Sequence, residues 1–426
     1  MNASLDTAIP AAPARFGAFD RLLRGHLLKR MGPLQGRALE IEDPLGRATV
    51  GRGDPRVPLW LQVRDPAFYR AVAMNGSVGA AEAYMDGHWS CDDLVGLVRV
   101  LVRNRDLLDG VESGAARLGG WAMRGVHALR ANTRAGARRN ISAHYDLGNA
   151  FFRLFLSDDL MYSSALWAGD GDTLERASAR KLERICTKLR LQPGDHVLEI
   201  GTGWGGFALH AAARHGCRVT TATISREQYD LACQRVRDAG LQDRVTVLLQ
   251  DYRDLTGQYD KLASIEMIEA IGAAQQRRYF AQLGSLLKPE GLALVQAITI
   301  EDHRYRQALH SVDFIKRHVF PGCFIPSISA MLEAKTASSD LALVHLEDFG
   351  SSYARTLRHW RERFLVRLPE VRAQGYDARF ARMWEFYLAY CEGGFRERSI
   401  GVAQMLFAKP GCRDAEYIAG LDRIEA

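Results

Sequence analysis

The segment HVLEIGTGWGGF, residues 196–207, decides the fold class. Residues 196–200 are short and mostly apolar, which predicts a buried strand. Four glycines follow, at Gly201, Gly203, Gly205 and Gly206, and an amphipathic helix is predicted over 207–215. A strand, a glycine turn and a helix bring backbone N–H groups against a nucleotide-like ligand, because a Cβ there would block the approach or forbid a positive φ.

The residues around this turn favour one nucleotide-like cofactor over another. Gly201 to Gly206 fits the G-x-G-x-x-G pattern of dinucleotide sites, which is weak evidence alone. A dinucleotide site needs an acid about 20 residues further on, but Thr-Ile-Ser follows the strand predicted at 217–222. The acid lies before the turn, at Glu199, where it suits the cationic amino group of S-adenosylmethionine. We therefore favour S-adenosylmethionine over NAD, and over a turn that only packs a helix on a sheet.

Strands and helices alternate from residue 141 onward, which predicts a doubly wound parallel sheet of the α/β class. The strands are predicted at 196–200, 218–223, 244–249, 261–267 and 291–299. The helices between them are predicted near 206–215, 226–239 and 275–287. Two later strands, 341–346 and 402–409, are expected to be the last strands of the sheet, antiparallel and at its edge.

A chain of 426 residues is expected to form two domains. We expect a disordered Ala/Pro-rich tail at 1–15, a small α+β domain at 16–102, a basic amphipathic linker at 103–140 and a catalytic domain at 141–426. The linker is interpreted either as a membrane-surface segment or as a helix lying on the protein. Residues 352–398 are helical and aromatic, and could wall an apolar pocket of the catalytic domain.

Composition limits the cellular setting. The net charge of +6 is a mild basic bias that favours an anionic surface. The seven cysteines are odd in number and form no C-x-x-C pair, so neither a disulfide framework nor a metal site is expected, and a reducing cytoplasm fits. No secretory signal and no apolar run of about 18 residues occurs, so we expect any membrane contact to be peripheral.

Polar side chains follow two of the predicted strands at the edge where ligands bind in such sheets. Thr223, Ser225 and Gln228 come just after the second strand and could hydrogen-bond the ribose hydroxyls. Gln250 and Asp251 end the third strand, where an adenine amino group would find an acceptor. The alternative is that Ser225 only caps a helix and Asp251 only closes a turn.

Two acids, Glu266 and Glu269, end the fourth strand, within SIEMIEAIG. A buried carboxylate at this place would act as a base or stabilise a positive charge. The alternative is a pair of exposed acids at a strand end with no role in chemistry.

Many segments together resemble the cyclopropane-fatty-acyl-phospholipid synthases and the related mycolic acid methyltransferases. The resemblance is dense over residues 140–412 and looser in the N-terminal domain, through GAAEAYMDGHWSCDDL. The segments that carry it occur in the family's order: HYDLGNAFFRLFL, MYSSALW, LEIGTGWGGFA, TISREQ, LLQDYRDL, SIEMIEAIG, FIKRHVFPGCFIPS, FGSSYARTLRHWRERF and FYLAYCEGGFRER.

The resemblance implies a class I S-adenosylmethionine-dependent methyltransferase, Rossmann-like with a seven-stranded sheet, a helical cover over an acyl channel, and an N-terminal lipid-binding module. It adds Tyr145, Tyr162 and Ser163 to the cofactor-binding residues. It implies methyl transfer to the cis double bond of an unsaturated phospholipid acyl chain, which leaves a carbocation. Loss of a proton from the new methyl group gives a cyclopropane, which is the expected product; the alternative is loss of a neighbouring proton, which gives a methyl- or methylene-branched unsaturated chain.

The chain departs from the family where many members hold bicarbonate as the base. The family's cysteine and histidine are replaced by Ser164 and Gln296, whereas its glutamate and tyrosine remain as Glu269 and Tyr353. These replacements argue against bicarbonate binding. Our hypothesis is that Glu266, an additional acid, supplies the base, or that the product is not a cyclopropane.

One further residue and several partners follow from the resemblance. Cys391 matches a cysteine described as an active-site residue of the family, although a structural or substrate-lining role suits it better, since the alkene attacks the methyl group directly. The expected partner is unsaturated phospholipid, which the protein would contact as a peripheral protein on the cytoplasmic face of the membrane. No nucleic-acid partner is expected. A homodimer is left open.

Two other functional classes compete with this interpretation. A catalytically degenerate lipid-binding protein is suggested by Ser164 and Gln296, although the cofactor residues look intact. A nucleic-acid or small-molecule methyltransferase is allowed by the basic charge, but no Asn/Asp-Pro-Pro-Tyr/Phe motif occurs.

Overall fold

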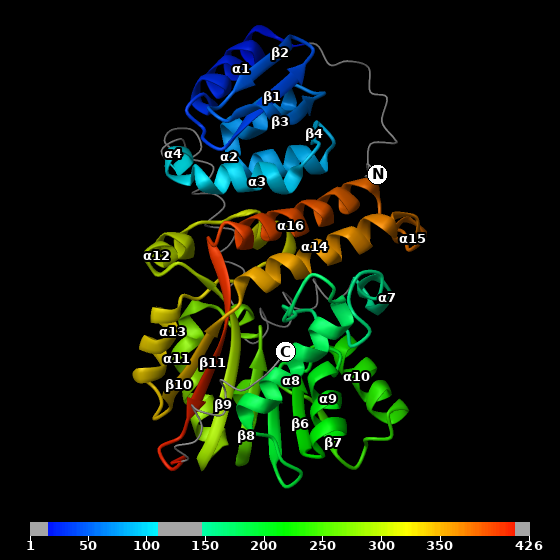
Figure 1. Ribbon diagram of the computed structural model, residues 1–426, viewed down its shortest axis with the longest axis vertical. Coiled ribbons are helices and arrows are strands. Elements are labelled where there is room, and N and C mark those ends of the chain that lie inside the picture. Colours follow the sequence, from blue (N-terminus) through cyan, green and yellow to red (C-terminus); the bar gives the residue numbers. More distant parts are fainter. Residues whose placement is uncertain (1–15, 110–146, 414–426) are drawn as a thin grey trace. The chain divides into compact units, whose positions relative to one another are not determined.

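The structure is a computed structural model that describes residues 16–109 and 147–413 (Figure 1). The expected tail at 1–15, the linker beyond Asp109 and Tyr145 lie outside the described residues. The chain forms two compact units. Of the described residues, the first unit contains 16–109, 310–319 and 357–399, and the second contains 147–309, 320–356 and 400–413.

The first unit begins as a small α+β fold. Its elements are α1 (Ala18–Met31), β1 (Arg37–Asp43), β2 (Gly46–Val50), β3 (Asp54–Val63), α2 (Ala67–Met85), β4 (Trp89–Cys91), α3 (Leu94–Arg103) and α4 (Arg105–Asp109). The four strands form one sheet in the order β2-β1-β3-β4, in which only β1 and β3 pair in parallel. Helix α2 is kinked at Gly76, whose φ is 55°.

Helices from late in the sequence complete this unit. They are α14 (Gly350–Val366) from residue 357 onward, α15 (Leu368–Ala373) and α16 (Ala378–Arg396), and α16 packs on α2 and α3. The contact with α3 is close, because a Cβ on Gly393 would lie 2.5 Å from Cγ1 of Val98. This division differs from the expected one, which assigned residues 352–398 to the catalytic domain.

The second unit is built on a seven-stranded sheet, as predicted for the class I fold. Its strands are β5 (His196–Ile200), β6 (Arg218–Thr223), β7 (Val245–Leu249), β8 (Tyr259–Ile265), β9 (Leu287–Ile300), β10 (Ala342–Asp348) and β11 (Ile400–Ala408). Their order is β10-β11-β9-β8-β5-β6-β7, and the pairs that β5 to β9 form with one another are all parallel. The predicted strands and the doubly wound sheet are confirmed.

The expectation for the two last strands was partly wrong. β11 is antiparallel to both of its neighbours, but it lies inside the sheet, between β9 and β10. Of these two strands only β10 lies at an edge of the sheet, and because β11 is antiparallel to both β9 and β10, β10 runs in the same direction as β9. The physical reason is burial: residues 402–408 of β11 are all buried, whereas β10 is partly exposed along its whole length.

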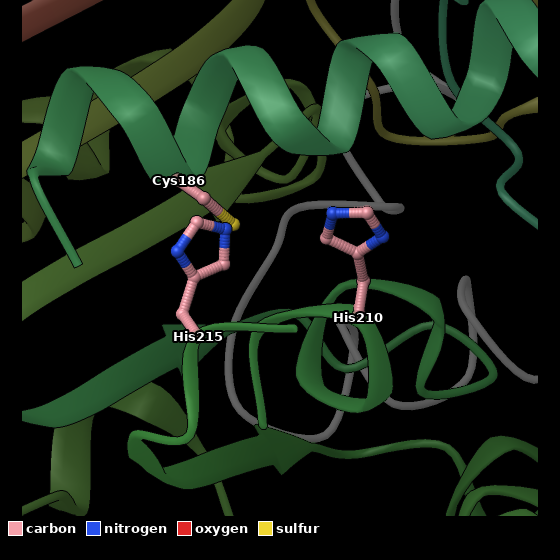
Figure 2. A group of neighbouring side chains, drawn as sticks. All are labelled: Cys186, His210 and His215. Carbon is pink, nitrogen blue, oxygen red and sulfur yellow. The ribbon is translucent and has the colours of Figure 1, made fainter. Parts of the chain in front are cut away.

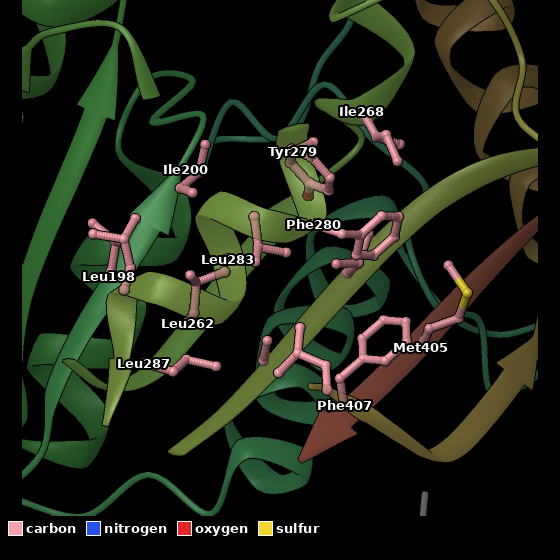
Figure 3. Packing of buried hydrophobic residues seen from close by; sticks show 14 of the residues in the cluster. Leu198, Ile200, Leu262, Ile268, Tyr279, Phe280, Leu283, Leu287, Met405 and Phe407 are labelled. Carbon is pink, nitrogen blue, oxygen red and sulfur yellow. The ribbon is translucent and has the colours of Figure 1, made fainter. Parts of the chain in front are cut away.

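Helices cover both faces of this sheet (Figure 1). α8 (Leu174–Leu189), α9 (Gly206–His215) and α10 (Arg226–Asp238) contribute to the core on one face. α11 (Gln276–Leu286) and α13 (Ile328–Thr336) contribute to the core on the other. Figure 3 shows the second of these cores, where Phe280 and Leu283 of α11 pack with Phe407 of β11. Short helices α7 (Asn149–Phe152) and α12 (Asp302–His310) lie in the connecting segments.

Two features of this fold bear on the site. In the described part of the chain, no helix has the length and apolar character needed to cross a membrane. The chain leaves β5 toward β6 on one side and later returns to β8 on the other, so the carboxyl end of β5 lies at the topological switch point, where ligands bind in open α/β sheets.

Candidate active site

The glycine turn after β5 has the backbone that only glycine adopts easily. The φ angles of Gly201, Gly203 and Gly205 are +100°, +51° and +86°. Gly206 is required for a different reason, because a Cβ there would lie 2.6 Å from Sδ of Met161. The turn therefore leaves a backbone surface without side chains at the start of α9, which fits the close approach of S-adenosylmethionine.

Glu199, at the end of β5, is buried beside this turn. Its Oε2 accepts a hydrogen bond of 2.6 Å from Oγ1 of Thr221 on β6. Burial raises the pKa of Glu199 to about 8, although the hydrogen bond from Thr221 and the charge of Lys181 oppose the shift. A buried carboxylate of this kind is well placed to be stabilised by a cationic group of a ligand.

Lys181 is a fully buried cation that the sequence interpretation missed. Its Nζ donates a hydrogen bond of 2.9 Å to Oγ of Ser163. Burial lowers the pKa of Lys181 to about 8, while the nearby acids Asp159, Glu266 and Glu199 favour its charged form. The signal was available in the sequence, since Lys181 falls on the buried face of α8. Lysine at such a position needs a polar partner inside the fold.

The three residues expected at the ribose hydrogen-bond one another. Oγ1 of Thr223 donates to Oε1 of Gln228 at 2.8 Å, and the backbone N–H of Ser225 donates to Oγ1 of Thr223 at 3.1 Å. Ser225 also caps α10, because its Oγ accepts a hydrogen bond from the backbone N–H of Gln228. The structure thus brings the three together, and their contact with ribose stays a prediction.

The pair expected at the adenine makes local contacts. Both carboxylate oxygens of Asp251 accept hydrogen bonds from the guanidinium of Arg253, at 2.8 and 2.6 Å, and one also accepts from the backbone N–H of Arg253. Nε2 of Gln250 donates to the carbonyl oxygen of Asp254 at 2.7 Å. Asp251 therefore closes a turn, as the alternative interpretation had it, and the adenine contact stays a prediction.

Glu266 is the centre of the candidate catalytic site. Its Oε1 accepts hydrogen bonds from the backbone N–H of Ser164 at 2.9 Å and from Nε2 of Gln296 at 2.8 Å. Its Oε2 accepts one from the hydroxyl of Tyr353 at 2.7 Å. The structure therefore brings four of the predicted catalytic residues together from four separate segments. Glu266 also has a φ of +49°, a strained backbone for a side chain of this size.

The surroundings of Glu266 have opposing effects on its pKa. Burial raises the pKa of Glu266 and is the largest effect. The three hydrogen bonds and the charge of Lys181 lower it in part, because they stabilise the ionised carboxylate. The result is a carboxylate more basic than an exposed glutamate and fixed in position by its donors.

A chain of buried polar groups orients Gln296. Oε1 of Gln296 accepts a hydrogen bond of 3.0 Å from Nε2 of Gln404 on β11, and Oε1 of Gln404 accepts one of 2.8 Å from Nζ of Lys188. Lys188, on α8, also donates to Oε2 of Glu347 at 2.5 Å. Neither Gln404 nor Lys188 was singled out from the sequence, although both are polar residues on otherwise apolar faces.

Glu269 lies after the same strand but has a different environment. Its Oε1 accepts a hydrogen bond of 2.6 Å from the backbone N–H of Ile298, and its buried Oε2 has no hydrogen-bond partner among the described residues. Burial, and then the charge of Glu266, raise the pKa of Glu269 to about 8. Glu269 is therefore mostly protonated near neutral pH.

The residues present do not fit a bound bicarbonate ion. The donors of Ser164, Gln296 and Tyr353 are already directed at the carboxylate of Glu266. A second anion beside the carboxylate of Glu266 would meet like charge in a buried site. The carboxylate of Glu266 thus occupies the donors that an anion would need, in line with the hypothesis drawn from the sequence.

Two further candidates differ in their surroundings. The ring of Tyr162 packs against Phe152 and Phe320, with ring centroids 5.2 and 6.3 Å apart, so its ring lies in an aromatic cluster of the second unit. Cys391 belongs to α16 of the first unit, whereas all the other described candidates belong to the second. Its role stays a prediction.

Comparison with known proteins agrees with this geometry. Residues 132–405 match the family model described as mycolic acid cyclopropane synthetase. The chain belongs to this family. The resemblance noted from the sequence is therefore confirmed. As a member of the mycolic acid cyclopropane synthetase family, the chain is an enzyme, a methyltransferase of the class I fold.

Curated relatives within this family span almost the whole chain. The tuberculostearic acid methyltransferase UfaA1 of Mycobacterium tuberculosis is 38% identical, over 94% of this chain and 93% of the relative. The cyclopropane-fatty-acyl-phospholipid synthase of Escherichia coli K12 is 37% identical, over 83% of this chain and 88% of the relative. The similarity thus extends beyond the second unit.

A solved structure supports the fold. The mycolic acid cyclopropane synthase CmaA1, complexed with SAH and CTAB, is 28% identical and has a TM-score of 0.60. The match covers 64% of this chain and 98% of CmaA1, so the class I sheet and its helices are shared.

Proposed function

We propose that this methyltransferase acts on the cis double bond of an unsaturated phospholipid acyl chain and that Glu266 accepts the proton released. Family membership supports the coarser function, which is methylation of lipid acyl chains with S-adenosylmethionine as the methyl donor. The observation that carries the finer proposal is the buried carboxylate of Glu266, held by donors from Ser164, Gln296 and Tyr353.

The residues of the glycine turn would hold the donor. S-adenosylmethionine supplies an electrophilic methyl group when it is bound. Gly201, Gly203 and Gly205 leave the backbone open to it, and the buried Glu199 is the acid for its amino group. Lys181 holds Ser163, the neighbour of Ser164, and so links this part of the site to Glu266.

The proton transfer follows from the charges at Glu266. Attack of the alkene on the methyl group would form a C–C bond while the methyl–sulfur bond of the donor breaks, with its electron pair left on the sulfur, and a carbocation would remain on the acyl chain. An anionic carboxylate stabilises that cation and then accepts a proton from a carbon beside it, with the C–H electrons forming the new bond. The raised pKa of Glu266 makes it a stronger base than an exposed glutamate.

The product that the site supports best is a methyl- or methylene-branched unsaturated chain. The site departs from the bicarbonate-binding residues of the resemblance at Ser164 and Gln296, and Glu266 takes the donors instead. One near-full-length relative is named for tuberculostearic acid and not for a cyclopropane. A cyclopropane product is the second candidate, supported by the presence of Glu269 and Tyr353 and by the relative from Escherichia coli.

An arginine-lined pocket in the first unit supports a phosphate-bearing substrate. The pocket has a volume of about 200 Å³ and is lined by Arg37, Arg99, Arg103, Arg358, Arg361 and Arg396. Their ion-pair partners are four carboxylates: Asp93, Glu362, Glu392 and Glu397. Six guanidinium groups against four carboxylates leave a positive excess, and guanidinium groups match phosphate oxygens well. We propose that this pocket takes the phosphate of a membrane phospholipid, on the cytoplasmic face.

Lipid analysis tests the reaction. Purified protein is incubated with S-adenosylmethionine and liposomes of monounsaturated phospholipid, and the released fatty acids are analysed by mass spectrometry. A gain of one CH₂ is expected, and hydrogenation then separates a branched alkene, which takes up hydrogen under mild conditions, from a saturated ring. No mass gain while the cofactor still binds would overturn the proposal in favour of a lipid-binding protein without activity.

Liposome sedimentation tests the membrane part. The ion pair that Arg358 forms within the described part of the chain is with Glu362, at 3.9 Å, so Arg358→Gln leaves Asp93, Glu392 and Glu397 paired. We expect this variant to sediment less with anionic liposomes than the unchanged protein. Arg226→Gln is the matched control, since Arg226 forms an exposed pair with Asp230 of the same helix. Equal sedimentation of all three proteins would contradict the role of the pocket.

A further inference from the structure

Four potential metal ligands meet between α8 and α9, away from the residues used above. Glu183 and Cys186 lie three positions apart on α8, and His210 and His215 lie on α9. Figure 2 shows the ring of His215 beside the side chain of Cys186, and the ring of His210 to one side of them, pointing toward α8. The ligand atoms of Cys186, His210 and His215 all lie within 4.8 Å of one another.

Glu183 connects the two histidines. Its Oε2 lies 3.0 Å from Nε2 of His210, and its Oε1 lies 3.2 Å from Nε2 of His215. In a tetrahedral site with metal–ligand bonds of 2.0–2.3 Å, neighbouring ligand atoms are roughly 3.3–3.7 Å apart. The carboxylate of Glu183 already lies near that spacing from each imidazole, and the sulfur of Cys186 lies within 4.8 Å of the ligand nitrogens of both histidines.

We propose that Glu183, Cys186, His210 and His215 bind one divalent transition-metal ion, with Zn²⁺ as the best fit. Zn²⁺ takes thiolate, imidazole and carboxylate ligands in four-coordinate sites, whereas Mg²⁺ and Ca²⁺ take oxygen ligands. A thiolate and a carboxylate together carry two negative charges, so a divalent ion gives a neutral cluster, which suits a site of limited exposure.

Burial at the cluster fits a structural site with an open side. Cys186 is fully buried and the two histidine side chains are only 14% and 19% exposed. The Glu183 side chain is 46% exposed and gives the ion a route from solvent. All four coordination positions are filled by the protein, which is typical of structural rather than catalytic zinc.

The site would join two helices that carry residues of the candidate active site. α8 carries Lys181, two positions before Glu183, and α9 begins at Gly206, in the glycine turn. An ion bound here would therefore fix α8 against α9 and stabilise the folded state by binding it in preference to the unfolded chain.

Metal titration of the full-length protein tests the proposal and needs no activity measurement. The protein is treated with a chelator, dialysed and titrated with Zn²⁺, and separately with Co²⁺, whose absorption reports tetrahedral and thiolate coordination. We expect about one ion per chain, a sulfur-to-cobalt charge-transfer band and a higher melting temperature with Zn²⁺. Binding well below one ion per chain, or Co²⁺ spectra without the thiolate band, would overturn the proposal.

Variants separate this site from adventitious binding. Cys186→Ala should abolish the charge-transfer band, and His210→Gln, at a less buried position, should weaken Zn²⁺ binding about 100-fold, since one of four ligands is lost. Cys233→Ala, which removes a cysteine on α10, is the matched control and should leave both signals unchanged. A band that persists in Cys186→Ala, or that is lost in Cys233→Ala, would refute the assignment.

Discussion

Nε2 of Gln404 donates a hydrogen bond of 3.0 Å to Oε1 of Gln296, and this contact sets which end of the Gln296 amide faces Glu266. With its oxygen held by Gln404, the amide presents its nitrogen to the carboxylate. Gln404 is itself oriented by Lys188, whose Nζ donates to its Oε1. The charged amine of Lys188 thus orients Gln404, and Gln404 orients Gln296, so that the amide nitrogen of Gln296 and not its oxygen faces Glu266.

Substitution of Gln404 should therefore reduce catalysis without touching the cofactor. Gln404→Leu frees the Gln296 amide to turn its oxygen toward Glu266, and we expect kcat to fall about tenfold, the value of one buried hydrogen bond. The affinity for S-adenosylmethionine, measured by calorimetry, should not change. Gln234→Leu, on an exposed face of α10, is the control. Equal kcat for the two variants would contradict the orienting role.

Glu266→Gln should abolish turnover while the cofactor still binds. The amide cannot accept the proton, and loss of a general base costs about 10²–10⁴ in rate. Glu269→Gln is the matched comparison, because the pKa of about 8 keeps Glu269 neutral near pH 7 and an amide resembles a neutral carboxyl group. We expect Glu269→Gln to keep kcat within about tenfold. If Glu269→Gln were the inactive variant and Glu266→Gln the active one, the roles of the two acids would be reversed.

The pH dependence of kcat should show the raised pKa of Glu266. A protonated carboxyl group cannot act as the base, so activity should fall as the pH is lowered through this pKa. Because the pKa is raised, the loss should occur at a higher pH than for an exposed glutamate. An acid limb at the ordinary pKa of glutamate, about 4.3, would count against Glu266 as the base.

Tyr353→Phe should move that acid limb further. The hydroxyl of Tyr353 stabilises the ionised carboxylate, so its removal raises the pKa of Glu266 and shifts the limb to higher pH. The control is Tyr305→Phe, since the Tyr305 hydroxyl hydrogen-bonds Gln276 on α11. A limb that moves equally in both variants, or toward lower pH in Tyr353→Phe, would argue against this contact.

Gly206→Ala should disturb the glycine turn by steric clash alone. The new Cβ would lie 2.6 Å from Sδ of Met161 and 2.8 Å from the carbonyl oxygen of Asp159, and overpacking of this kind costs about 1–3 kcal/mol of stability. We expect a lower free energy of unfolding and weaker binding of S-adenosylmethionine. Gly194→Ala, where a Cβ meets nothing within 4 Å, is the control. Identical stability of the two variants would show that the turn can relax.

Sequence periodicity was sufficient for the strands of the second unit and for α9, α10 and α11, because each depends on its own apolar pattern, whereas α8 and α13 were not predicted. The position of β11 was not predictable in this way, because strand order depends on which neighbours bury a strand and not on the strand alone. The packing of α16 on α3 was not predictable for a similar reason. It rests on the close contact at Gly393 and Val98, which are almost three hundred residues apart.

The residues of the candidate site were likewise only partly predictable from the sequence. Glu266 was found through its place at the end of a predicted strand, and Ser164, Gln296 and Tyr353 through the resemblance; the structure brings the four together. Lys181, Lys188 and Gln404 were missed because their importance depends on partners in other segments, and a polar residue on an apolar face does not identify its partner. Cys186, His210 and His215 were missed as possible metal ligands for the same reason, since their spacing fits no linear zinc motif.

The interior position of β11 also has a consequence for how the enzyme is made. Residues 400–408 leave the ribosome after every other strand of the sheet, yet they separate β9 from β10. Until they emerge, β9 has an open apolar edge, which is a site for aggregation, and Gln296 lacks the partner that orients it. A nascent chain therefore exposes this edge until residues 400–408 have emerged, and a premature stop before residue 400 is expected to give an aggregation-prone chain rather than a weakened enzyme.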